Sequence, residues 1–217
     1  MSESAIVCVV DDDESVRGAL LRLLKSAGYR ARAFASGLAL LAEPPPDDSP
    51  MVVLTDLRMP GIDGLELAEK LNAYPLPPPI VFLSAHGDVP VSVRAMKDGA
   101  VDFLEKPVQE EDLFDALERA VARSREQILQ RRGLADLTEN FTKLTRRERQ
   151  VFALVISGLL NKEVAWELGI SEKTIKVHRA RVVEKMGARS LPDLVRMAEK
   201  LGIPSERPPE TARAPIA

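Results

Sequence analysis

The chain has 217 residues, 45% of them hydrophobic, which suggests one or two domains with a sizeable core. It has no apolar run near the roughly 20 residues that span a bilayer, and its polar, acidic start differs from a secretory signal, so we expect neither a membrane protein nor a secreted one. Cys8 is the single cysteine, which excludes an intrachain disulfide and fits a cytoplasmic protein.

The net charge of −3 conceals a strong asymmetry along the chain. Residues 1–120 carry 11 basic and 21 acidic side chains, whereas residues 121–217 carry 19 basic and 12 acidic ones. An acidic half joined to a basic half predicts two separate functions, and the basic half is a candidate for nucleic-acid binding.

The first half of the chain alternates short β-rich runs with amphipathic helical patterns, which predicts a doubly wound α/β domain around a five-stranded parallel sheet. We expect strands at 5–10, 29–35, 51–56, 80–84 and 101–105. We expect helices at 14–27, 36–41, 64–72 and 89–98, and from 110 to at least 121. The Pro- and Asp-rich segment 43–50 predicts an exposed loop.

The second half is predicted to be helical throughout. The pattern from residue 110 can continue through residue 130, with Gly133 and the polar segment up to 142 as a hinge. Four further helices are expected, with N-caps at Thr145 (paired with Glu148 in a capping box), Asn161 and Ser171. We therefore predict four regions: a first domain at 1–123, a helical linker at 124–142, an all-α domain at 143–202 and a disordered tail at 203–217.

Charged and hydroxyl side chains follow the predicted strands of the first domain. In open α/β sheets, ligands bind beyond the carboxyl ends of the strands, so these groups should share one edge. Asp11 and Asp12 suit an oxygen-seeking divalent cation, and Asp56 is the best nucleophile for a phosphoryl group. Lys106 and Ser84 can contact phosphoryl oxygens. Each residue alone is also common in turns and caps, but together they favour a phosphoryl-transfer site.

Four motifs in this domain resemble the receiver domain of two-component response regulators, which has a flavodoxin-like fold. They are VVDDD at 9–13, TDLRMPGIDG at 55–64, LSAHGD at 83–88 and GAVDFLEKP at 99–107. The resemblance implies that Asp56 is the phosphoacceptor for a sensor histidine kinase. It also implies Mg²⁺ or Mn²⁺ held directly by Asp12, Asp56 and the backbone carbonyl of Arg58, with Asp11 acting through water.

The same resemblance implies roles for five positions around the site. Lys106 is the phosphate-sensing lysine, with a cis bond to Pro107. Ser84 and Phe103 form the switch pair, where the family often has Thr and Tyr; a plain core aromatic is the alternative for Phe103. Arg58 and His86 flank the site at positions that tend to set the rate of autodephosphorylation.

The all-α domain contains a short helix, a Gly-containing turn and a second, basic helix, which is the pattern of a helix-turn-helix. Ile175, Val182 and Met186 are expected to face inward. The opposite side carries a basic stripe that suits DNA phosphates but could also be a solvated surface: Lys173, Lys176, Arg179, Arg181 and Lys185.

The segments LTRRERQV at 144–151 and NKEVAWELGISEKTIKVHRARVVEKM at 161–186 resemble the LuxR-type helix-turn-helix of NarL/FixJ response regulators. The resemblance places Lys176 and Val177 near base edges. It assigns backbone contacts to Lys173, Thr174, His178 and Arg179, with Arg181 on the same face. Trp166 stands where a polar residue is expected, which indicates either partial burial against a neighbouring helix or a docking contact.

The receiver motifs are most similar to the FixJ branch, which implies dimerisation on phosphorylation through the segment 89–104, with Val91, Val93 and Val101 at or near the face. The predicted protein is a transcription regulator, not a turnover enzyme. It would bind double-stranded DNA at a two-fold promoter site, with RNA polymerase as a further candidate partner.

Three other classes of protein were compared with this prediction. An aspartyl phosphohydrolase needs a second Asp two residues after the nucleophile, where this chain has Arg58. A protein-binding helical module fits the basic charge poorly. A small-molecule sensor would need a ligand pocket, and the first half shows none beside its acidic site.

Overall fold

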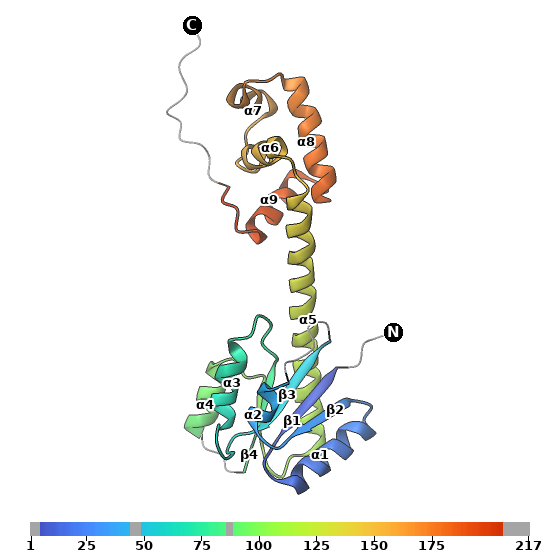
Figure 1. The fold of residues 1–217 in the computed structure, drawn as a ribbon, viewed down its shortest axis with the longest axis vertical. Helices are drawn as coiled ribbons and strands as arrows, with labels where there is room; N and C mark the ends of the chain where they lie inside the picture. Colours follow the sequence, from blue (N-terminus) through green and yellow to red (C-terminus); the bar gives the residue numbers. More distant parts are fainter. Residues whose placement is uncertain (1–4, 44–48, 86–88, 206–217) are drawn as a thin grey trace. The chain divides into compact units, whose positions relative to one another are not determined.

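The computed structural model describes residues 5–43, 49–85 and 89–205, and the chain divides into two compact units, Met1–Leu129 and Gln130–Ala217. Figure 1 shows the fold. Three sequence-based expectations fall wholly or partly outside the described residues: the loop at 43–50, the position of His86 and the disordered tail. Among the described residues, no helix is both long and apolar enough to cross a membrane.

The first unit contains a five-stranded parallel sheet in the order β2-β1-β3-β4-β5, which confirms the predicted α/β fold (Figure 1). The strands are β1 (Ile6–Val10), β2 (Arg30–Phe34), β3 (Met51–Asp56), β4 (Ile80–Ser84) and β5 (Asp102–Glu105). The helices are α1 (Glu14–Ser26), α2 (Gly37–Leu41), α3 (Gly64–Asn72), α4 (Val89–Lys97) and the start of α5 (Glu110–Thr142).

Both faces of the sheet are covered, which explains why the central strands are continuous apolar runs. On one face, Val7, Val9 and Leu54 pack with Leu24 of α1 and Leu117 of α5. On the other face, apolar side chains from α2, α3 and α4 cover the alternate strand residues: Cys8, Val10, Val53 and Phe82, with Leu40, Leu67 and Ala95 from the helices. The sheet is therefore a rigid layer whose edge can position side chains accurately.

The strand register decides which side chains meet at that edge. Val10 pairs with Thr55, so the next residues, Asp11 and Asp56, are neighbours on adjacent strands. Asp56 pairs with Leu83, which directly precedes Ser84.

Helix α5 is continuous from Glu110 to Thr142 and passes through Gly133, where the sequence favoured a hinge. A glycine in a helix interior costs only about 1 kcal/mol relative to alanine, so packing elsewhere on the helix can outweigh it. Leu113 and Leu117 are buried in the first unit, and Leu137 is buried in the second. The helix is thus anchored within each unit by its own apolar residues.

The second unit is all-α, with α6 (Arg146–Ile156), α7 (Asn161–Leu168), α8 (Glu172–Met186) and α9 (Leu191–Lys200) around one core. Thr145 and Glu148 form the predicted capping box, and the Ser171 hydroxyl caps α8 by accepting from the Thr174 N–H at 3.1 Å. The prediction that Asn161 caps α7 is wrong. The N-cap is Leu160, whose N–H donates to Glu163 Oε2 at 2.7 Å.

Candidate functional site

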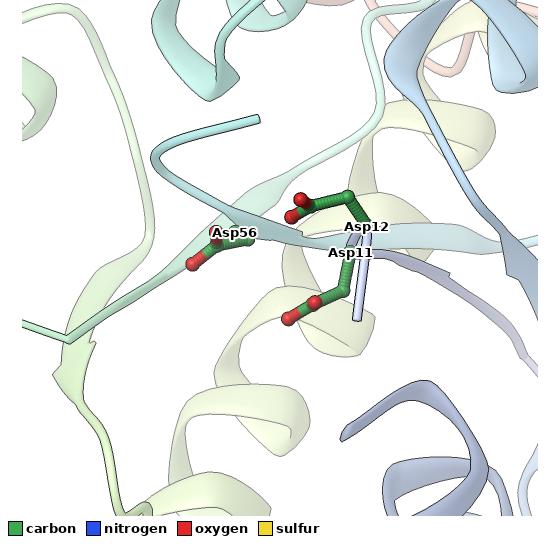
Figure 2. A group of neighbouring side chains, drawn as sticks. All are labelled: Asp11, Asp12 and Asp56. Carbon is green, nitrogen blue, oxygen red and sulfur yellow. The ribbon is translucent and has the colours of Figure 1, made fainter. Parts of the chain in front are cut away.

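Three carboxylates gather at the carboxyl ends of β1 and β3. Asp11, Asp12 and Asp56 each offer an oxygen, and these oxygens lie within 4.8 Å of one another. Figure 2 shows the side chains of Asp11 and Asp12 extending toward the side where Asp56 lies. Asp11 is 1% exposed and Asp56 is 9% exposed, so their negative charges are poorly screened by water. This arrangement requires positive charge to be stable.

Lys106, directly after β5, supplies part of that positive charge. Its Nζ donates to Asp11 Oδ2 at 2.7 Å and to Asp56 Oδ1 at 2.8 Å. Burial acts to lower the pKa of Lys106, but the hydrogen bonds to Asp11 and Asp56 outweigh burial and raise it, so the ammonium stays protonated. The Lys106–Pro107 peptide bond is cis, as the resemblance implied.

The donor set fits a divalent cation that prefers oxygen. Lys106 takes one oxygen of Asp11 and one of Asp56, so the second oxygen of Asp56 and the carboxylate of Asp12 are the donors available to an oxygen-seeking ion. Three carboxylates against one ammonium leave an excess of two negative charges. The site is therefore chemically suited to Mg²⁺, while the contribution of the Arg58 carbonyl stays a prediction.

The turn after β1 is held by contacts that sequence inspection partly missed. Asp13 caps α1 through its Oδ1, which accepts from the Ser15 N–H at 2.7 Å, as predicted. The Asp13 N–H donates to Asp11 Oδ1 at 2.9 Å, and Arg17 Nη1 donates to the Asp11 carbonyl at 2.7 Å. Apart from its charge, nothing in the sequence distinguished Arg17 as a residue that contacts the strand end.

The two predicted switch residues occupy different environments. Ser84 ends β4 and is buried, whereas Phe103 on β5 is half-buried, with its ring centroid 6.3 Å from that of Phe82. The Phe103 N–H donates to Asp102 Oδ1 at 2.8 Å, and Asp102 also pairs with Arg119 of α5. Phe103 therefore lies on a strand that is tied directly to α5, although its movement remains a prediction.

Helices α7 and α8 form the predicted helix-turn-helix, with Gly169 in the left-handed conformation (φ 64°) at the turn. The inward side of α8 is as predicted, because its three apolar residues are buried: Ile175, Val182 and Met186. The side chains predicted to contact DNA are exposed except for two half-buried ones, His178 and Arg179; the exposed ones are Lys173, Thr174, Lys176, Val177 and Arg181. Val177 is 47% exposed, so its side chain is accessible, as the predicted base contact requires.

Lys185 does not belong to this basic stripe, contrary to the expectation from its spacing. Its Nζ donates to Glu148 Oε2 at 2.7 Å and to the Lys143 carbonyl at 3.2 Å. Glu148 is 2% exposed, and the hydrogen bonds from Lys185 and the Thr145 N–H lower its pKa to about 2. The Lys185–Glu148 pair therefore stabilises the second unit, since it joins the last turn of α8 to the start of α6.

Two other predicted surfaces differ in part from expectation. On the predicted dimer face, Val93 is 47% exposed, whereas Val91 and Val101 are half-buried against the cores of the first unit. Trp166 is 64% exposed, so its predicted partial burial is wrong. The alternative, a docking contact, stays a prediction.

The fold and the two sites define a two-domain protein of the regulator class, with an acidic cluster at the edge of a five-stranded parallel sheet and a helix-turn-helix in the second domain. Residues 7–118 match the response regulator receiver domain, and residues 142–198 match the bacterial regulatory proteins of the luxR family. The chain belongs to the two-component response regulators with a LuxR-type DNA-binding domain.

Relatives of similar length support this assignment over most of the chain. Nodulation protein W of Bradyrhizobium diazoefficiens is 45% identical over 97% of this chain and 92% of its own. Transcriptional regulatory protein FixJ of Azorhizobium caulinodans is 44% identical over 94% of this chain and 96% of its own. The solved structure of response regulator StyR matches with a TM-score of 0.78 at 44% identity, over 91% of this chain and 99% of that one.

These findings confirm the predicted fold and family: the chain is a transcription regulator of the two-component class and not a turnover enzyme. A receiver joined to a LuxR-type domain implies a histidine kinase as the partner of the first and DNA as the partner of the second.

Proposed function

We propose that a sensor histidine kinase phosphorylates Asp56 and that this modification controls DNA binding through dimerisation. The observation that carries the proposal is that Asp11, Asp12 and Asp56 cluster at one edge of the sheet, where Lys106 forms ion pairs with Asp11 and Asp56. A buried carboxylate between a cation site and a fixed ammonium is suited to accept a phosphoryl group.

The transfer requires little from the protein beyond position and charge. An Asp56 carboxylate oxygen attacks the phosphorus of the kinase phosphohistidine, the P–N bond breaks with its electron pair going to the imidazole nitrogen, and an acyl phosphate forms. Mg²⁺, when bound, offsets negative charge on the phosphoryl oxygens. Lys106 pairs with one phosphoryl oxygen, and the Ser84 hydroxyl donates to another. Hydrolysis of the acyl phosphate then resets the protein, at a rate influenced by Arg58 and His86.

The phosphorylated receiver is proposed to pair with a second copy through the face that contains Val91, Val93 and Val101. Exposed Val93 is the anchor, and Met96, one turn later on α4, is also exposed. Two paired chains would present two α8 helices to a two-fold promoter site, where RNA polymerase is a further proposed partner. Lys176 and Val177 would contact base edges, and the remaining basic residues would contact phosphates.

The test of the phosphorylation step uses acetyl phosphate with Mg²⁺ and intact-mass spectrometry. The wild-type chain should gain one phosphoryl group, and Asp56→Asn should gain none. Asp13→Asn is the matched control, because Asp13 lies in the same acidic segment but caps α1. Stoichiometric labelling of Asp56→Asn would show that the acceptor is another residue.

A further inference from the structure

The side chain of Asn161 contacts the recognition helix instead of capping its own helix. Asn161 Oδ1 accepts a hydrogen bond from Arg179 Nη1 at 3.0 Å, and both side chains are half-buried. Capping at the start of α7 does not use the Asn161 side chain, since the Glu163 carboxylate accepts the Leu160 N–H. The carboxamide is therefore available for a role between α7 and α8.

This hydrogen bond restricts the Arg179 side chain but leaves its other N–H groups able to bind a phosphate. Arg179 lies one helical turn after Lys176, on the helix proposed to enter the DNA groove. A guanidinium has five N–H donors, so one bond to Asn161 leaves others for a phosphate. Arg side chains lose considerable rotamer freedom when they bind, and a side chain that is already held loses less.

We propose that Asn161 is a positioning residue that pre-orients Arg179 for a phosphate of the DNA backbone. This inference rests on the proposed function, because it requires that α8 binds DNA. It goes beyond that function by assigning a role in DNA binding to a residue of α7 that need not touch the nucleic acid. The contact joins the two helices of the motif, so the α7–α8 arrangement itself sets the direction of Arg179.

The proposal makes different predictions for the affinity for DNA and for the salt dependence of that affinity. Arg179→Ala removes a phosphate contact, so the negative slope of log affinity against log salt should become shallower by about 0.9. Asn161→Ala removes no charge, so the slope should stay unchanged while affinity falls about twofold to tenfold, as expected for one side chain that must now be ordered on binding.

A double-mutant cycle on the full-length chain tests this coupling, with fluorescence anisotropy on a short duplex of arbitrary sequence at several KCl concentrations. Asn161→Ala should weaken binding in the wild-type background and have no further effect in the Arg179→Ala background. Asn161→Ser is the second variant: serine starts helices well but is too short to reach Arg179, so it should lose as much affinity as alanine. Thermal unfolding of each variant checks that the domain stays folded.

Each unfavourable outcome has a distinct meaning. If Arg179→Ala weakens binding but the loss from Asn161→Ala is additive to it, the positioning role is wrong and the proposed DNA face stands. Full affinity in Asn161→Ser with a loss in Asn161→Ala would assign the residue to helix initiation and would also overturn the inference. If Arg179→Ala binds like the wild type, Arg179 is not a phosphate contact and the inference is overturned; if Lys176→Ala also binds like the wild type, α8 is not the DNA-binding helix.

Discussion

The main-chain oxygen of Asp56 stands 2.5 Å from the point at which a Cβ atom on Gly64 would lie. Gly64 begins α3, and its N–H donates to the Leu57 carbonyl at 2.8 Å, so the helix starts directly against the end of β3. The ring of Phe82 closes the same space at 3.2 Å. The absence of a side chain at residue 64 therefore helps to set the position of the phosphoacceptor.

Gly64→Ala should displace the end of β3, because backbone atoms cannot yield as a flexible side chain does. We expect a loss of about 1–3 kcal/mol in the free energy of unfolding, together with slower phosphorylation of Asp56 by acetyl phosphate. Urea denaturation and intact-mass spectrometry measure the two effects. Gly133→Ala is the control, since its Cβ meets nothing within 4 Å in α5 and should not destabilise the chain. Equal behaviour of both variants would contradict the tight contact at Gly64.

Lys106→Met should increase the stabilisation of the unphosphorylated chain by Mg²⁺. The Lys106 ammonium neutralises Asp11 and Asp56 beside the proposed cation site, so its removal would leave more negative charge to attract a divalent ion. The melting temperature should be lower without Mg²⁺ and rise more steeply with Mg²⁺ concentration than in the wild type. Lys97→Met, on the exposed side of α4, should leave this response unchanged. A weaker response in Lys106→Met would mean that the lysine supports ion binding.

The Glu148–Lys185 pair should make the free energy of unfolding of the second unit depend on pH in the acid range. Hydrogen bonds lower the pKa of Glu148 from 4.5 to about 2, so its contribution is complete above pH 4.5 and is lost as the pH falls toward 2. Glu148→Gln should therefore lower the free energy of unfolding at pH 7, and the difference from the wild type should shrink between pH 4.5 and 2. Glu139→Gln, which alters an exposed pair with Lys143, should have little effect at any pH. A difference that is constant with pH would argue against the ion pair.

Glu172→Gln should strengthen DNA binding. Glu172 Oε1 lies 3.4 Å from the Nζ of Lys176, an exposed pair one turn apart on α8. Removing the carboxylate frees Lys176 and removes a negative charge beside the proposed phosphate contacts. Gel-shift titrations at fixed salt should show a higher affinity, whereas Glu199→Gln on α9 should not. An unchanged affinity would place Lys176 away from the DNA.

Val93→Lys should prevent dimerisation of the phosphorylated chain. Val93 is exposed on α4, and a charged side chain at the centre of a symmetric interface faces its own copy and repels it. Sedimentation velocity with acetyl phosphate and Mg²⁺ should show dimers for the wild type and monomers for the variant. Leu38→Lys changes an apolar residue on α2 that is more exposed than Val93, and this variant should still dimerise. Dimers in Val93→Lys would move the interface to another surface.

Local patterns were sufficient to predict the strands, most helix ends and the gathering of Asp11, Asp56 and Lys106 at one edge of the sheet. Apolar runs that end in Asp11, Asp56 and Lys106 are informative because parallel strands bring their carboxyl ends to one edge whatever the details of packing. The caps at Thr145 and Ser171 were equally predictable, since an N-cap acts on its own first turn. In all these cases the interacting residue lies within a few positions in the chain, or it follows from the rule that the carboxyl ends of parallel strands lie at one edge.

Spacing failed where a long side chain can choose between partners. Lys185 shares the helical periodicity of the basic stripe, yet it turns to Glu148, which is 37 residues away. Asn161 is of a residue type that is common at N-caps, yet its side chain accepts a hydrogen bond from Arg179. Of the two alternatives for Trp166, burial against a neighbouring helix is wrong because the side chain is exposed, and a docking contact stays a prediction.

The class of the protein follows from local patterns: two domains of opposite charge, the acidic strand ends with their lysine, and a basic helix after a glycine turn. These features depend on periodicity and on short-range chemistry. The folded chain was needed to show that Gly64 has no room for a side chain, that Lys185 pairs with Glu148 and that Asn161 contacts Arg179. Those roles depend on distances between segments far apart in the chain, which hydrophobic packing sets and which no local pattern encodes.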